Sequence, residues 1–159
     1  MNSKTIQSPI GDLTIIAEGE FITHIFFDCE AVDGKYNRQD TPVLLSAAKQ
    51  IKEYFAGTRK TFDIPIKPSG APFHKKVWEV MLAGVPFGTT ASYSDIAKLA
   101  GNQKAVRAVG AANNRNPIPI IIPCHRIVGK SGALTGFRAG LDVKEKLLEF
   151  ENETCKKLP

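Results

Sequence analysis

The sequence predicts an α+β protein in two parts: a small mixed α/β domain over residues 1–70 and a mostly helical domain over residues 71–159. Three observations predict this. Short β-branched and aromatic runs separated by turn residues fill the first 30 positions, helical spacing begins at Pro42, and two short helical patterns follow one another after residue 92. The Pro/Gly/Ser-rich segment KPSGAPF indicates the boundary between the two parts.

The first domain is predicted to begin as a β-meander. Its strands are expected at 5–7, 13–17 and 21–27, with turns at 8–11 and 18–20. Residues 30–41 are polar and predict a loop. Apolar residues then recur at helical spacing over residues 42–56, and Gly57 stands where such a helix would end. Residues 61–66 predict one more short strand.

The second domain is predicted to open with a helix over residues 73–82 and to continue with a helix-turn-helix. In SYSDIAKLAG, residues 92–101, either Ser92 or Ser94 can cap a helix that the final glycine closes. A second helical pattern covers residues 104–113. Two short helices joined by a tight glycine-containing turn are typical of the helix-turn-helix.

An apolar run follows the helix-turn-helix. The segment IPIIIP, residues 118–123, predicts a buried strand that ends directly at the sequence CHR. The next segment can form a hairpin or wing around residues 130–132. Apolar spacing over residues 143–150 predicts a terminal helix.

Composition excludes several classes of protein. The three cysteines, Cys29, Cys124 and Cys155, are odd in number, far apart and without a CxxC spacing, which argues against a disulfide framework and a cysteine-rich zinc site. The N-terminus has no signal-peptide pattern and no run of about 18 apolar residues occurs. We therefore expect an intracellular protein in a reducing compartment, with no membrane partner.

Positive charge is concentrated in one part of the sequence. The net charge of +5 is mild, but five Lys or Arg and no Asp or Glu lie between Lys98 and Arg126. Such a block is either a solvated face or the electrostatic footprint of a nucleic-acid surface. The charge pattern alone leaves both interpretations open.

Cys124 is the candidate reactive group, although a buried inert thiol is an equally simple reading. A cysteine becomes a strong nucleophile as a thiolate, which needs a base and a group that orients the base. His125 is adjacent, and Glu149 or Glu151 of the terminal helix could orient it. Because consecutive side chains of a strand point to opposite faces, the chain must turn at Pro123 for both groups to share a cavity.

The second helix of the helix-turn-helix carries small apolar residues and one arginine, Arg107. A helix that reads base edges usually presents several Arg, Asn, Gln or Lys side chains, so this helix predicts close approach to a groove with little sequence readout. Alternatively, its small residues only allow tight packing and Arg107 pairs with a carboxylate. Together with Cys124, the first reading suggests chemistry on a base rotated out of a duplex, with Arg107 filling the gap.

Four segments, IPIIIPCHRIV, SYSDIAKLAG, RAVGAANNRNP and GALTGFRAGLDVKEKLLEFE, resemble the O6-alkylguanine-DNA alkyltransferases, also called methylated-DNA–protein-cysteine methyltransferases. The match is dense over residues 73–151 and loose before them. The resemblance implies a ribonuclease-H-like sheet plus helix in the first domain and a winged helix-turn-helix in the second. It also implies DNA repair by a single irreversible alkyl transfer from O6-alkylguanine, with O4-methylthymine as a second candidate substrate.

The resemblance further implies a monomer without cofactor or metal that binds double-stranded DNA through the minor groove with little sequence preference. It would act in the cytoplasm of a prokaryote or the nucleus of a eukaryote. Cys124 would be the acceptor and His125 a base acting through a water oriented by Glu151. Asn116 would hold the turn before the active-site segment, and Tyr93 would crowd the target phosphate and supply a proton to guanine.

Two sets of residues would surround this centre. The implied DNA-binding residues are Tyr93, Ala105, Arg107, Ala108, Gly110, Ala111, Asn113, Arg115 and Arg126. The implied pocket residues are Pro119, Ile127, Phe137, Arg138 and Ala139, where backbone groups at Cys124 and Ile127 would receive the exocyclic amine of guanine and the Arg138 amide would lie near O6.

The sequence departs from the family pattern at two points. Many relatives carry tyrosine where this chain has Phe137, which removes a hydroxyl from the pocket wall. Cys29 and His24 lack a convincing four-ligand set, so the structural zinc of some relatives is not expected. Two other functions remain open from the residues alone: a winged-helix DNA-binding protein in which Cys124 is a bystander, and a Cys-His hydrolase that turns over repeatedly and ignores DNA.

Overall fold

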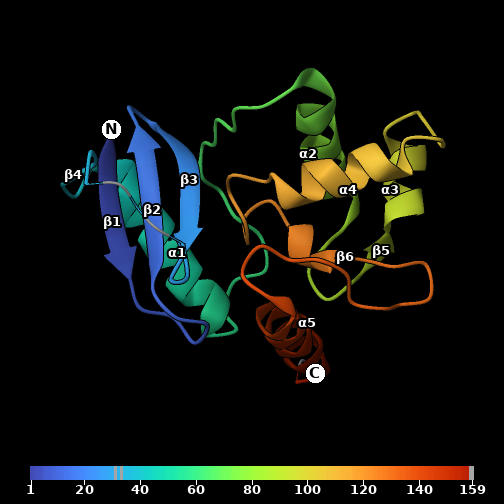
Figure 1. Cartoon of the computed structure of the whole chain (residues 1–159). Coiled ribbons are helices and arrows are strands. Elements are labelled where there is room, and N and C mark those ends of the chain that lie inside the picture. The colour runs from blue at the N-terminus through green and yellow to red at the C-terminus, as the bar shows by residue number, and fades with distance from the viewer. Residues whose placement is uncertain (31, 33, 158–159) are drawn as a thin grey trace. The chain divides into compact units, whose positions relative to one another are not determined.

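The computed structural model describes residues 1–30, 32 and 34–157. The chain forms two compact units, residues 1–69 and residues 70–159 (Figure 1). Both strands and helices are present, so the predicted α+β class is confirmed. Within the described ranges, no helix is long and apolar enough to cross a membrane.

The first unit contains a four-stranded sheet. Its strands are β1 (Asn2–Ile6), β2 (Leu13–Glu18), β3 (Phe21–Phe27) and β4 (Asn37–Arg38), in the order β3-β2-β1-β4. The first three strands are antiparallel neighbours, which confirms the predicted meander. Gly11 and Gly19 have positive φ angles of 103° and 60° at the two tight connections, a conformation that glycine adopts without strain.

Helix α1 (Pro42–Phe55) packs against this sheet (Figure 1). The Thr41 hydroxyl accepts a hydrogen bond from the Leu44 amide, proline stands in the first turn, and Gly57 adopts a φ of 80° just after the end. The helix therefore ends where the sequence predicts. The shared core consists of buried apolar side chains, mainly Leu13, Ile15, Ile25, Leu44, Ala47, Ile51 and Tyr54.

The predicted strand over residues 61–66 is wrong. Only a single parallel bridge forms there, between Ile22 and Ile66, where the Ile22 amide donates to the Pro65 carbonyl at 3.0 Å. Pro65 has no amide hydrogen, so it cannot extend a ladder. The sequence analysis also missed β4, because two residues in a polar stretch give no periodic signal.

The second unit is mostly helical. Its elements are α2 (Pro72–Gly84), β5 (Ala91–Ser92), α3 (Tyr93–Leu99), α4 (Val106–Asn114), the 3₁₀ helix η1 (Cys124–Arg126), β6 (Ile127–Val128) and α5 (Leu141–Lys156). Helices α2, α3 and α4 pack against one another (Figure 1). Trp78 of α2 is buried there, and its indole N–H donates to the Ala112 carbonyl at 2.9 Å.

The predicted helix-turn-helix is present as α3 and α4. Ser92, and not Ser94, caps α3: its hydroxyl accepts from the Asp95 amide, and the Asp95 carboxylate accepts from the Ser92 amide. This reciprocal capping box satisfies two backbone donors of the first turn. Gly101, with a φ of 84°, ends α3 and starts the turn.

The strand predicted for the following segment is wrong. Residues 118–123 are buried but form a tight turn and no strand: the Ile122 amide donates to the Ile118 carbonyl at 2.9 Å, and Ile120 has a φ of 74°. Two prolines in six residues remove the donors that a strand needs. The hairpin or wing predicted around residues 130–132 is present as a turn over residues 129–133, and among the described residues no antiparallel strand pair flanks it.

Candidate active site

Asn116 shapes the turn that leads to Cys124. Its amide nitrogen donates to the Ile122 carbonyl at 2.8 Å, and its side-chain oxygen accepts from the Ile118 amide at 2.9 Å. Asn116 is buried, so these bonds are shielded from water. The turn ends at Pro123, where η1 begins. Successive residues of a 3₁₀ helix are rotated by about 120°. The side chains of Cys124 and His125 therefore do not point in opposite directions, as they would in a strand.

His125 forms a buried pair with Glu151. Its Nε2 lies 2.6 Å from Oε2 of Glu151, and both side chains are almost fully buried. Glu151 therefore occupies the orienting position that the sequence left open between it and Glu149. Because an ionised carboxylate only accepts, Nε2 carries the hydrogen and Nδ1 is left with a lone pair. Nδ1 is buried and has no hydrogen-bond partner in the described part of the chain.

Arg126 holds the same carboxylate. Its Nε donates to Oε1 of Glu151 at 2.8 Å and its Nη2 to Oε2 at 3.0 Å, a two-point contact that is among the stronger types of hydrogen bond. Burial alone would raise the pKa of Glu151, but the hydrogen bonds and charges of His125 and Arg126 hold it well below its usual range. Burial lowers the pKa of His125. The centre is thus a neutral imidazole beside an ionised carboxylate.

The assignment of Arg126 to a DNA-binding surface is wrong. Its side chain is buried: Nη1 donates to the Val85 carbonyl at 2.9 Å, and the guanidinium lies 5.7 Å from the Phe87 ring centroid. An arginine whose donors are used internally cannot reach a phosphate. Asn113 is also buried, on the inner side of α4, and is removed from the predicted surface for the same reason.

Cys124 is buried, with only 4% of its surface exposed. Burial raises the pKa of the thiol, whereas a hydrogen bond with Asn116 and the charges of Arg138 and Lys144 lower it, and the net direction is upward. Because desolvation disfavours the anion, the thiol keeps its proton until a base removes it.

The remaining residues of the predicted DNA surface lie on α3, on α4 and at the two positions that flank α4. Arg107 and Arg115 are exposed, and Arg107 has no hydrogen bond or ion pair with a described residue. This argues against the alternative in which Arg107 pairs with a carboxylate. The half-buried small residues of this surface are Ala105, Ala108, Gly110 and Ala111. A methyl group built on Gly110 would meet open space, so packing within the chain does not require glycine there.

Among the predicted pocket residues, Arg138 contacts Asn116. Arg138 Nη1 donates to the Asn116 carbonyl at 2.6 Å. Pro119 and Ile127 are buried, Phe137 and Ala139 are half-buried, and the Arg138 side chain is exposed.

Sequence reasoning missed Lys144 and Thr135. Lys144 is fully buried in α5, and its Nζ donates to the carbonyls of Ile127 at 2.6 Å and Thr135 at 2.9 Å. The Thr135 hydroxyl lies 2.7 Å from that of Tyr93, the first residue of α3. A signal for Lys144 existed, because residues 144, 147 and 151 are spaced for one helix face, which is buried at all three positions.

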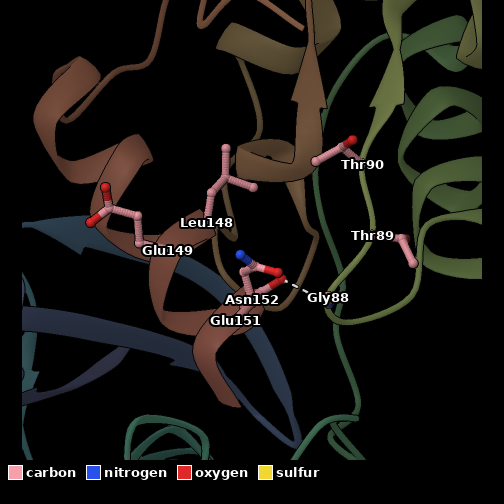
Figure 2. Close-up of a pocket in the computed structure, with 7 residues that line it drawn as sticks. All are labelled: Gly88, Thr89, Thr90, Leu148, Glu149, Glu151 and Asn152. Carbon is pink, nitrogen blue, oxygen red and sulfur yellow. Dashed lines mark hydrogen bonds between the residues drawn. The ribbon is translucent and has the colours of Figure 1, made fainter. Parts of the chain in front are cut away.

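A cavity of about 300 Å³ lies beside Glu151, between α5 and the loop before β5 (Figure 2). Its lining residues are Gly88, Thr89, Thr90, Leu148, Glu149, Glu151 and Asn152. The Gly88 amide donates to Oε1 of Glu151 at 3.3 Å. Cys124 does not line this cavity.

A helix-turn-helix unit with a buried cysteine beside a histidine–glutamate pair defines a DNA-binding protein with a candidate acceptor thiol. Residues 72–153 match the family model of the 6-O-methylguanine DNA methyltransferase DNA binding domain, and residues 1–68 match its ribonuclease-like domain. The chain belongs to the methylated-DNA–protein-cysteine methyltransferase family.

Relatives support this over nearly the whole length. The constitutive methylated-DNA–protein-cysteine methyltransferase of Bacillus subtilis is 45% identical over 159 residues, covering 96% of each chain. The enzyme of Methanosarcina acetivorans is 43% identical over 150 residues, covering 91% of this chain and 94% of the relative. The crystal structure of Mycobacterium tuberculosis OGT in complex with DNA superposes with a TM-score of 0.90 at 39% identity, covering 97% of this chain and 94% of that one.

Proposed function

We propose that this protein repairs O6-alkylguanine in double-stranded DNA by transferring the alkyl group to Cys124, once per molecule. The observation that carries the proposal is a buried Cys124 that directly precedes the paired His125 in the same unit as the helix-turn-helix. His125 is bonded to Glu151 through Nε2, and its Nδ1 has no hydrogen-bond partner among the described residues. In this assignment the second unit binds DNA and accepts the alkyl group, and the first unit is structural.

The reaction begins with the thiol proton. His125 is neutral and its Nδ1 can accept, so the proton passes from Cys124 to His125, through a water in the manner that the family resemblance implies. The resulting imidazolium is stabilised by ionised Glu151, which Arg126 holds in place. The positive charge that the proton brings to the imidazole is thus balanced by the buried Glu151 carboxylate.

The sulfur then attacks the alkyl carbon. A new carbon–sulfur bond forms while the carbon–O6 bond breaks, and its electron pair leaves with guanine. The guanine anion takes a proton from the Tyr93 hydroxyl, and the proton held on His125 then returns through solvent to the Tyr93 oxygen. The net change is balanced: thiol and alkyl ether become thioether and guanine. A thioether does not hydrolyse and no second thiol stands near Cys124 in sequence, so each molecule reacts once. No cofactor is needed because the sulfur is the acceptor.

DNA binding is assigned to the exposed face of α4. Its small residues allow close approach to the minor groove, and Arg107 is free to occupy the gap that a rotated nucleotide leaves. Since few side chains on this face can read base edges, the binding depends little on sequence. We propose that the protein acts as a monomer. It would be found where the DNA is, in the cytoplasm of a prokaryote or the nucleus of a eukaryote.

The proposal is tested by incubating the protein with a duplex that carries methyl-labelled O6-methylguanine. We expect label on Cys124, found by peptide mass spectrometry, with an endpoint of one methyl group per protein and none on Cys124→Ala. Continued turnover would indicate a hydrolase. Full DNA binding without any label would indicate a non-catalytic winged-helix protein. A duplex with O4-methylthymine, run in parallel, tests the second substrate.

A further inference from the structure

The loop between α2 and β5 contacts both members of the Arg126–Glu151 pair. The Val85 carbonyl accepts a hydrogen bond from Arg126 Nη1 at 2.9 Å, and the Phe87 ring centroid lies 5.7 Å from the Arg126 guanidinium. The Gly88 amide donates to Oε1 of Glu151 at 3.3 Å (Figure 2). Three neighbouring residues of one short loop therefore hold this pair, and sequence reasoning assigned none of them to the site.

The Gly88 amide completes a set of donors around the Glu151 carboxylate. Oε1 accepts from Gly88 and from Arg126 Nε, and Oε2 accepts from His125 and from Arg126 Nη2. An ionised carboxylate has about four lone-pair sites, so each site of this carboxylate has a donor. Rotating the carboxylate would break hydrogen bonds on both oxygens. The donors on Oε1 thus help to keep Oε2 in line with His125.

The place of this amide requires glycine at position 88. The Thr89 amide donates to the Pro86 carbonyl at 3.1 Å, which closes a four-residue turn, and Gly88 has a φ of 80° at the third position of that turn. A type II turn requires a positive φ at this position. A methyl group on Gly88 would also collide with the sulfur of Cys155 in α5. Backbone conformation and space therefore exclude a side chain independently of each other.

We propose that Gly88 is a positioning residue for the alkyl transfer: its amide fixes the Glu151 carboxylate, which in turn orients His125. A backbone amide in a closed turn is a donor that is already in place, whereas a water molecule in the neighbouring cavity would first have to be ordered. The inference rests on the proposed function for its effect on repair, but the geometry of the His125–Glu151 pair can be measured without alkyl transfer.

The first test is the single-turnover reaction of Gly88→Ala with free O6-benzylguanine, followed by intact mass. Alanine is strained at this φ and collides with Cys155, so the amide has to move away from Glu151. We expect the maximal rate to fall about tenfold. The substrate concentration that gives half of the maximal rate should stay unchanged, because the effect passes through the proton acceptor and not through substrate binding.

The matched control is Gly132→Ala. Gly132 has a similar φ of 85° in the same unit, and a methyl group there meets open space. This variant carries the same backbone strain away from Glu151, so both constants should equal those of wild type. Circular dichroism establishes that each variant is folded. A Gly88→Ala rate equal to wild type overturns the proposal, and so does an equal loss in the two variants.

The second test follows the ring N–H of His125 by proton NMR and needs no substrate. A proton in a short hydrogen bond is deshielded, so the Nε2 proton, whose nitrogen lies 2.6 Å from Oε2 of Glu151, should resonate far downfield and be missing in His125→Asn. In Gly88→Ala this resonance should move upfield as the bond lengthens, and in Gly132→Ala it should stay in place. An unmoved resonance in Gly88→Ala overturns the proposal. If wild type does not react with O6-benzylguanine or methylated duplex while the resonance moves, the proposed function fails and the positioning role of Gly88 stands.

A third variant changes the donor alone and applies even if Gly88→Ala fails to fold. Replacing the amide of residue 88 by an ester, with glycolic acid in place of glycine, removes the N–H and adds no side chain to the turn. The maximal rate should again fall, at an unchanged half-saturating concentration. A rate equal to wild type would mean that the donor is not used, and it overturns the proposal.

Discussion

At the residue scale, Glu151 organises the site. His125, Arg126 and the Gly88 amide all contact its carboxylate, which is buried in α5. A buried ion pair adds little net stability compared with apolar packing, but removing one partner leaves the other charge without compensation. Glu151 therefore affects both the orientation of His125 and the stability of the second unit.

Glu151→Gln should lower the free energy of unfolding by about 3–5 kcal/mol, because it leaves the Arg126 cation buried without an anion. Glu149→Gln, an exposed change on the same helix, should stay within about 0.5 kcal/mol of wild type. Urea titrations followed by circular dichroism compare the two. Equal losses in both variants would contradict the assignment of Glu151 to the buried centre.

The same carboxylate should make stability depend on pH. The folded-state pKa of Glu151 lies below its ordinary value of 4.5, so its contribution is present above pH 4.5 and is lost as the pH falls below that value. Repeating the urea titrations between about pH 3 and 7 should show wild type losing stability in this acidic range more steeply than Glu151→Gln. Parallel curves would indicate that Glu151 is not held ionised.

Residues with local signals were the easiest to predict. Cys124 and His125 stand together after an unusual apolar run, and Asn116 precedes a proline within the same motif. Arg126 was misassigned because its partner lies 25 residues away, and charge in a sequence does not reveal whether a side chain is buried. Lys144 was overlooked because a lysine on an amphipathic helix is usually taken for a solvent-facing residue.

At the scale of elements, the sequence predicted what local chemistry controls. Capping by Ser92, the glycine that ends α3 and the helical spacing of α1 are all short-range features. Strands β5 and β6 are two residues each and pair across 36 positions, so no local pattern indicates them. The turn over residues 118–123 was mistaken for a strand, because a short apolar run does not distinguish a strand from another buried segment.

Helix α4 provides the prediction at this scale. Arg107→Ala should slow repair of a methylated duplex by about tenfold or more, since no side chain then replaces the rotated nucleotide, a loss of about 1.4 kcal/mol or more. Reaction of the same variant with free O6-benzylguanine needs no rotation and should change little. Single-turnover rates measured by intact mass give both values. Equal losses on the two substrates would remove the wedge role.

At the scale of the whole molecule, only part of the basic block between Lys98 and Arg126 is exposed at the surface, where it can contact DNA. Of the five cations between Lys98 and Arg126, Arg126 is buried against Glu151, and the other four, Lys98, Lys104, Arg107 and Arg115, are exposed. The basic block is therefore partly a structural feature and partly a surface. The sequence could not separate these two uses, because burial depends on contacts made by α5.

This count limits the salt dependence of DNA binding. If the four exposed cations each neutralise one phosphate, log K should fall against log salt with a slope of about −3.6, roughly a hundredfold weakening between about 50 and 200 mM salt. Fluorescence anisotropy with Cys124→Ala and unmodified duplexes measures this without alkyl transfer. Duplexes of different sequence should give similar values, because α4 presents few groups that read base edges. A strong preference for one sequence would indicate a regulator, and a much steeper slope would require further cations at the interface, outside residues 98–115.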